Sequence, residues 1–307
     1  LLDDCIYNGV LPFSNLARMA FIATAILKSL VKTGMLSEDD QSDLKGSIKT
    51  ITSQVINDYA SLHDKGLTID EFLKKYGHLR PGTYDINSKR YDEDPTLYLN
   101  QIEVPQTLHY SKHEIPQEKL KQIDQLLVEH GLKSNSSQLM TFIKDAIRGR
   151  EDAKFGFTKA VSLVLRMVEQ IGSEFGIVRA DMAYIDIHSL LRWDSSVAVD
   201  GLGEWLQNQI SNNKEAFIYE KALNLPDIIT EFTDIHIYQQ LQSKPNFVTK
   251  NRIVSDLVCL DDNVDQVITN KIVMIESSDP GFDWIFAHKI AGLVTMYGGA
   301  NSHMAIR

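Results

Sequence analysis

The residues best suited to do chemistry lie at the C-terminal end of the sequence, where a glycine pair leads to His303. Gly298 and Gly299 follow an apolar run, and Ser302 immediately precedes the histidine. A neutral imidazole is a good nucleophile, and its unperturbed pKa of about 6.5 keeps it mostly uncharged at pH 7. This spacing suits a histidine that carries a phosphoryl group.

The residues around this imidazole suit a phosphoryl group in the first turn of a helix. The unpaired N–H groups and partial positive charge of a helix N-terminus favour an attached anion. Gly298 and Gly299 allow the backbone to approach phosphate oxygens. Asn301 or Ser302 can cap the helix, and Arg307, one turn further on, can clamp the phosphate. The alternative is a histidine that only caps a buried helix beside a glycine turn.

The stretch Val294–Arg307 resembles the phosphohistidine signature of the phosphoenolpyruvate-utilising enzymes, which include pyruvate phosphate dikinase, phosphoenolpyruvate synthase and rifampin phosphotransferase. His303 matches the residue that is phosphorylated in this family. The other matching positions are Thr295, Gly298, Gly299, Ser302, Ala305 and Ile306. The departures are Asn301 for threonine, Met304 for alanine, and Arg307 where the family often has an apolar residue. The resemblance implies a swivelling phosphohistidine domain.

Two further stretches are similar to the same enzymes. Residues 72–82 and 90–95 resemble a Tyr-Gly-His-Arg run followed by an Arg-aromatic and Glu-Asp-Pro run, although Leu79 separates the histidine from the arginine here. Residues 150–155 resemble an Arg-Glu-x-x-Lys helix. The resemblance therefore gives acceptor or domain contacts to four residues, which are His78, Arg80, Arg150 and Lys154. The alternative is ordinary ion pairing on a helix, with His78 as a helix-end residue.

Composition limits the class of protein. The chain has 307 residues, 43% of them hydrophobic and 23% charged, which fits a soluble protein of two domains. A net charge of -10 argues against nucleic acid as a partner. With no export signal and no apolar run of about 18 residues, we expect a cytoplasmic protein without a membrane partner. Cys5 and Cys259 are expected to be buried free thiols, and the histidines lack metal-ligand spacing, so no metal site is expected.

The periodicity of apolar residues predicts a mainly helical protein that ends in an α/β unit. The predicted helices are Pro12 to about Val31, Ser37 to about Leu62, Ile69–Tyr76, Gln117–His130, Ser137 to about Phe175 with a break at Gly149, Asp181–Leu191 and Gly203–Leu223. Residues 79–112 are predicted to be a loop. The predicted strands are Phe247-Val248, Arg252–Leu260, Lys271–Ile275 and Gly292–Tyr297, with helices over Trp284–Ile290 and from Ser302.

These elements and the resemblance together predict the organisation of the chain. Residues 1–241 form a large helical central or linker domain that is a possible acceptor-binding region, and residues 242–250 form a linker. Residues 251–307 form the first part of an incomplete α/β swivelling phosphohistidine domain. We interpret the sequence as a fragment truncated at both ends.

The resemblance implies part of an ATP-dependent dikinase-type phosphotransferase. ATP and Mg²⁺ are expected on a nucleotide-binding domain in cis outside this sequence, which has no glycine-rich phosphate loop, so this fragment alone is expected to be inactive. The phosphoryl group would pass through His303 to pyruvate or to another small-molecule acceptor. The alternative class is a non-catalytic helical docking or regulatory module with a histidine domain that only binds.

Overall fold

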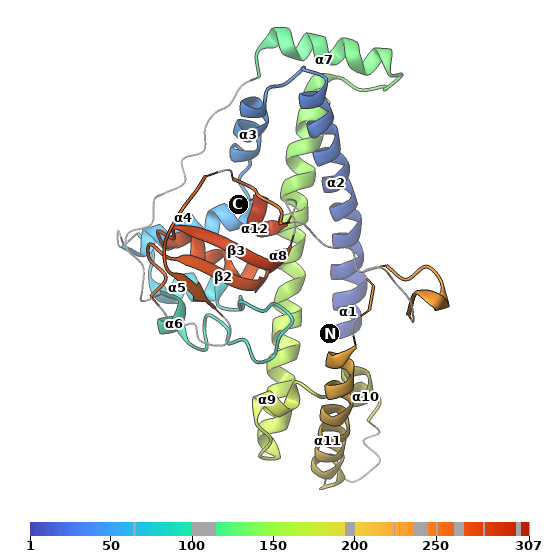
Figure 1. Ribbon diagram of the computed structural model, residues 1–307, viewed down its shortest axis with the longest axis vertical. Coiled ribbons are helices and arrows are strands. Elements are labelled where there is room, and N and C mark those ends of the chain that lie inside the picture. Colours follow the sequence, from blue (N-terminus) through green and yellow to red (C-terminus); the bar gives the residue numbers. More distant parts are fainter. Residues whose placement is uncertain are drawn as a thin grey trace.

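The computed structural model describes residues 1–63, 66–99, 115–193, 200–223, 225–226, 228–235, 245–249, 251–260, 267–278, 280–298 and 302–306. Over these residues the protein is mainly helical, with a small three-stranded parallel sheet near the C-terminal end (Figure 1). This confirms the predicted mainly helical class.

Two long antiparallel helices form the axis of the molecule (Figure 1). The first is continuous from α1 (Leu2–Asp4) through the π-helical turn η1 (Cys5–Val10) into α2 (Leu11–Lys32), and the second is α8 (Ser136–Glu174). The residues buried between these helices and their neighbours α3 and α7 are Ala23, Leu27, Leu30, Leu36, Leu44, Ile123, Leu127, Leu139, Met140, Ile143 and Ala146. The axis is therefore held by an apolar seam.

Glycines lie at or near the two places where the predicted helix boundaries at the seam were wrong. The first helix was predicted to begin at Pro12, and α8 was predicted to break at Gly149. A Cβ atom at Gly9 would lie 2.7 Å from Phe157 Cβ, and one at Gly149 would lie 3.4 Å from Leu16 Cδ2. Gly9 thus allows close packing of the two helices, whereas a Cβ atom at Gly149 would be in ordinary van der Waals contact with Leu16. The helix continues through Gly149 despite the low helix propensity of glycine, because the apolar seam on either side is packed.

The helix predicted from Ser37 to about Leu62 is divided into α3 (Glu38–Gly46) and α4 (Ile51–His63). Ser37 caps α3 as predicted, because its hydroxyl accepts from Asp40 N while the Asp40 carboxylate accepts from Ser37 N. The division follows from a second helix N-terminus, at the start of α4, which the periodicity of apolar residues did not show. Thr50 N donates to Ser53 Oγ at 3.0 Å and Ser53 N donates to Thr50 Oγ1 at 3.3 Å.

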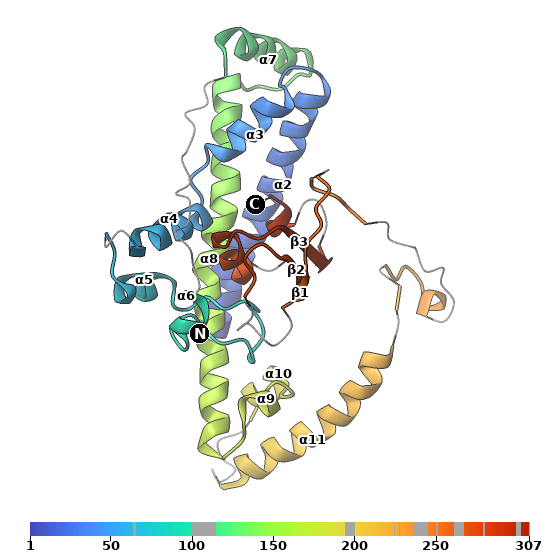
Figure 2. The same ribbon diagram turned by 60° about the vertical axis from the view of Figure 1, so that its left-hand side comes forward.

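The remaining helices are shorter. Helix α5 (Ile69–Tyr76) has the predicted Thr68 cap, and α6 (Pro95–Leu99) lies within the predicted loop. Helix α7 (Gln117–Glu129) crosses one end of the axis in both views (Figures 1 and 2). At the other end, the single helix predicted over 181–191 is divided into α9 (Arg179–Met182) and α10 (Ile187–Leu191). They are followed by α11 (Asp200–Ala222) and by the 3-10 turn η2 (Phe232–Ile235).

The sheet has the order β1-β2-β3, and both pairings are parallel. Its strands are β1 (Leu257–Cys259), β2 (Ile272–Ser277) and β3 (Gly292–Tyr297). Between β2 and β3 the chain forms the 3-10 helix η3 (Pro280–Ala287) where an α-helix was predicted, and α12 (His303–Ile306) follows β3. The strand predicted at Phe247-Val248 does not form, and the strand predicted over 252–260 shortens to β1. The parallel pairing agrees with the predicted α/β character of this part of the chain.

The sheet shares a hydrophobic core with the segment that contains α4, α5 and α6. On the helical side the buried residues are Tyr59, Phe72, Tyr76, Tyr91 and Tyr98. On the sheet side they are Val258, Leu260, Ile268, Val273, Ile275, Trp284, Ile285 and Met304. The α/β part is therefore docked on the helical part in this structure.

The two cysteines are free, as predicted, but only Cys5 is buried. Cys259 is exposed because it lies on the open face of the edge strand β1, whose burial alternates along its three residues. The prediction of two buried thiols was therefore wrong for Cys259.

One helix among the described residues, Leu2–Lys32, is long and apolar enough to cross a membrane. Its most apolar window has a mean hydropathy of 1.6 and is 17% buried in the fold. The prediction considered only uninterrupted apolar runs and missed it, because isolated polar residues such as Asn15 and Arg18 interrupt the run. A core helix and a signal sequence satisfy the same criterion, so this helix does not assign a location.

The apolar seam gives a stability prediction. Leu27 is fully buried in α2, whereas Ile22 on the same helix is exposed. We expect Leu27→Ala to lower the free energy of unfolding by about 2–5 kcal/mol, because it removes packed methyl groups and leaves a cavity. The matched change Ile22→Ala should cost less than about 1 kcal/mol in the same urea titration. Equal losses would mean that α2 does not pack as described.

Candidate functional site

The helix that begins at His303 lies at the carboxyl edge of the parallel sheet. Strands β2 and β3 end side by side, with Ser277 opposite Tyr297. Ser302 then caps α12, because its hydroxyl accepts a hydrogen bond from Ala305 N at 3.3 Å. The Ser302 cap and the start of the helix at His303 confirm the sequence predictions for these two backbone positions. In open α/β sheets, ligands bind at this carboxyl edge.

Gly298 makes a turn between β3 and this helix that other residues disfavour. Its φ of +141° is rare for residues with a side chain, and a Cβ atom there would lie 2.1 Å from Ser278 Oγ. Ser278, which directly follows β2, donates through its hydroxyl to Tyr297 O at 3.2 Å. The ends of β2 and β3 are thus joined next to the turn that leads to His303. Sequence reasoning missed Ser278, since nothing in the local pattern showed which residue faces Gly298.

The other residues predicted at this site are distributed as follows. Thr295 lies within β3, opposite Ile275 of β2, and is partly buried. Met304, which replaces the family's alanine, is buried in the core shared with the helical part. The predicted residues Gly299, Asn301 and Arg307 lie outside the described residues, as does the side chain of His303.

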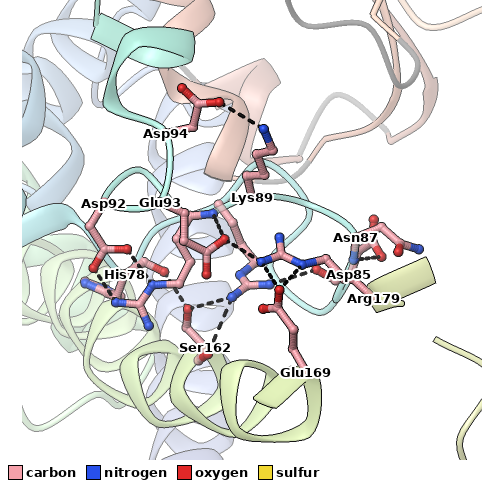
Figure 3. A network of polar contacts seen from close by, with 12 residues as sticks. His78, Asp85, Asn87, Lys89, Asp92, Glu93, Asp94, Ser162, Glu169 and Arg179 are labelled. Carbon is pink, nitrogen blue, oxygen red and sulfur yellow. Dashed lines mark hydrogen bonds and ion pairs between the residues drawn. The ribbon is translucent and has the colours of Figure 1, made fainter. Parts of the chain in front are cut away.

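A second polar cluster contains His78, which is labelled in Figure 3, and Arg80, which bonds to Asp85 and Ser162 of the same cluster. Arg80 is 3% exposed, and its guanidinium donates to Asp85 O at 3.1 Å and to Ser162 Oγ at 3.3 Å. Ser162 lies on α8 and in turn donates to His78 O at 2.7 Å. Arg80 therefore fastens the segment after α5 to the middle of the long helix.

Two further arginines and their carboxylates surround Arg80. Arg90 donates from Nε and Nη2 to the two oxygens of Asp92, at 2.8 and 2.5 Å. Arg179 donates to Glu93 at 3.0 Å and to Glu169 at 2.7 Å. Burial lowers the pKa of Arg80, and so do the neighbouring Arg90 and Arg179, while Glu93 opposes them. The charges of this cluster are largely balanced within the fold, as buried charges require.

His78 is largely buried against Phe155 of α8, with the ring centroids 4.8 Å apart. Its Nε2 atom is buried without a hydrogen-bond partner among the described residues. Burial lowers the pKa of His78 to about 4, helped by the positive charges of Lys159 and Arg90 and opposed by Asp92. The imidazole is therefore neutral at pH 7, which favours a packing role over contact with an anion.

The structure does not bring the four predicted acceptor or domain contacts together in one site. Arg150 on α8 stacks over the Phe21 ring of α2 at 5.6 Å and pairs with the adjacent Glu151 at 3.4 Å. Its contacts are therefore on the α2 side, whereas His78 and Arg80 contact α8 further along, at Phe155 and Ser162. Lys154 lies on α8 between these two sets and is partly buried.

No group of three or more His, Cys, Asp or Glu residues suited to a metal ion occurs within the described ranges. No protein-family model matches the chain, and no curated protein sequence matches it either. The arguments for its function therefore come from the residues and their geometry, together with the resemblance described above.

The Gly298 turn gives a second prediction. Gly298→Ala combines a strained backbone with a clash against Ser278, so we expect it to destabilise the end of β3 by about 3 kcal/mol or more. Gly34 is the control, because its φ is +77° but a Cβ atom there would have no described atom within 4 Å. Gly34→Ala should cost only about 1–2 kcal/mol. Hydrogen exchange of β3 and urea unfolding would measure the difference.

Adding Ser278→Gly to Gly298→Ala should restore part of the lost stability, because it removes the clashing atom and leaves the backbone strain. If Gly298→Ala were no more damaging than Gly34→Ala, the close approach to Ser278 would not exist in solution.

Burial of neutral His78 gives a pH prediction. Since its pKa is lower in the folded protein than in the unfolded chain, its contribution to stability is complete above about pH 6.5 and is lost as the pH falls toward about 4. Over that window the protein should lose up to about 3 kcal/mol more than the His78→Gln variant. Urea titrations at pH 7.5 and 4.5 would measure this. If the wild-type protein and His78→Gln lost the same stability between these pH values, the prediction would be contradicted. His130→Gln, which lies outside this cluster, is the matched control substitution.

Proposed function

We propose that the protein is part of an ATP-dependent dikinase-type phosphotransferase in which His303 carries the phosphoryl group. One observation supports this most directly: β3 leads through the Gly298 turn to a Ser302-capped helix that begins at His303, at the carboxyl edge of a parallel sheet. Backbone N–H groups at such an edge favour a bound phosphate. The resemblance of residues 294–307 to the phosphohistidine signature supports the same function.

The proposed chemistry is two successive in-line transfers. In the first, a neutral imidazole nitrogen of His303 attacks the β-phosphorus of ATP, and an N–P bond forms as the bond from that phosphorus to the α–β bridging oxygen breaks and AMP leaves. Water then removes the γ-phosphate as inorganic phosphate, which leaves a single phosphoryl group on His303. In the second, an oxygen of the acceptor attacks the same phosphorus and the imidazole leaves. ATP and its Mg²⁺ would be bound by a nucleotide-binding domain in cis, and residues 1–307 by themselves would not turn ATP over.

The acceptor is proposed to be pyruvate or another small molecule. The helical part remains the proposed acceptor-binding region, but Arg80 is buried and already bonded to Ser162, and the His78 ring packs against Phe155. For these two residues we favour the role of holding the segment after α5 on α8. Arg150 and Lys154, which are partly exposed, remain the proposed acceptor or domain contacts.

The second candidate function is a non-catalytic docking or regulatory module. The shared core of Tyr59, Tyr98 and Trp284 favours this candidate, because it holds the α/β part at one position on the helical part in this structure. In that case the histidine would contribute to binding only. Both candidates are proposed to act in the cytoplasm, without nucleic acid or membrane partners.

Phosphorylation separates the two candidates. We expect the complete natural chain, given ATP labelled at the β-phosphate, to gain acid-labile phosphate. His303→Ala should abolish the label, whereas His130→Ala, at the end of α7, should retain it. Labelling that persists in His303→Ala, or that is absent from the wild-type chain in the presence of Mg²⁺, would overturn the phosphotransfer proposal.

A further inference from the structure

The contact between η3 and the helical segment 51–99 is the feature that fixes the position of the α/β part. Helix α4 packs against η3. The Trp284 ring meets the Tyr98 ring in an edge-to-face contact with centroids 6.4 Å apart. Edge-to-face aromatic pairs add a directional attraction to the burial of their surfaces. Within the shared core, the Tyr98–Trp284 pair is thus a directional contact between the two parts.

The covalent connection contributes little to this position. Residues 245–249 and 251–256 have neither helix nor strand, and nearly all of them are exposed, with Phe247 at 79% and Val254 at 90%. An exposed, extended connection allows the joined part to change position without loss of its own core.

Each member of the aromatic pair is anchored within its own part of the protein. Tyr98 donates its hydroxyl to Lys89 O at 2.8 Å and stacks on Tyr91 with the centroids 4.6 Å apart. Trp284 meets the His288 ring edge to face, with the centroids 5.5 Å apart, within the sheet part. Separating the two parts would therefore break the Tyr98–Trp284 contact while both sets of internal contacts remain.

Burial of the Trp284 indole carries a cost that separation of the two parts would remove. It is 8% exposed, and its Nε1–H is buried without a hydrogen-bond acceptor among the described residues. A buried donor without an acceptor is costly, and it recovers its hydrogen bond when water reaches it. The free-energy cost of exposing apolar surface on separation is thus partly offset by the hydrogen bond that the indole N–H regains from water. This favours a reversible contact over a permanent one.

We propose that the Tyr98–Trp284 pair is a reversible latch that docks the α/β part on the helical part. In the latched state the buried Met304 holds α12, and with it His303, against the shared core. In the open state the α/β part would keep its sheet while its docking face becomes exposed to water. The latch stands on the contacts alone, but its purpose, which is to free His303 for a second site, rests on the proposed function.

Hydrogen exchange on the intact chain tests the latch. Tyr98→Ala should speed the exchange of amides in 282–290 by about tenfold or more, because it removes the ring that Trp284 contacts. The amides of β2 should keep their protection. Tyr98→Phe is the matched control: it loses the bond to Lys89 O but keeps the ring, so exchange in 282–290 should stay within about twofold of wild type.

The wild-type protein provides a second measurement that requires no substitution. At low urea, exchange in 282–290 should depend on urea less steeply than exchange in β2, because opening the latch exposes less surface than unfolding does. Equal urea dependence, or a Tyr98→Ala variant in which β2 and 282–290 accelerate together, would overturn the latch. Neither readout uses ATP or His303, so failure of phosphorylation would leave this result intact.

Discussion

The fold depends on α8 remaining a single straight helix. It has 39 residues, so it spans about 58 Å at 1.5 Å per residue. All three hydrophobic clusters use it: Ile143 in the seam with α2, Phe155 beside the sheet's core, and Val168 against α9 and α11. A kink at Gly149 or Gly156 would therefore displace the clusters relative to one another. The elements that surround α8 are short, and they acquire their positions from it.

Buried charge provides the second constraint on the architecture. Arg80 is held almost without solvent between Asp85 and Ser162, and its charge is balanced through space by Glu93. Such a group is costly to bury and is tolerated only where its partners are fixed. The irregular segment after α5 consequently has a defined path, which brings Tyr91 and Tyr98 to the side of the molecule where the sheet docks. The buried Arg80 cluster thus positions the aromatic side chains against which the sheet packs.

Local signals in the sequence predicted the start of several elements. The caps at Ser37, Thr68 and Ser302 were confirmed, because a capping side chain bonds to backbone only a few residues away. The continuity of α8 through Gly149 was not predicted, since it depends on the apolar seam with α2, whose residues are distant in sequence. For the same reason, the sequence did not show that Ser278 faces Gly298. It also did not show that Arg80 and Arg150 contact different parts of the fold. Long-range packing decided these cases.

The second half of α11 has a practical consequence for work with the folded protein. Its end and the residues after it present large apolar side chains to water, among them Phe217, Ile218, Tyr219, Leu223, Leu225, Ile228 and Phe232. Dyes that fluoresce in apolar surroundings bind such surfaces on native proteins as well as on partly unfolded ones. A thermal-shift scan with these dyes should therefore start from a bright baseline, and intrinsic spectroscopy will follow melting more faithfully.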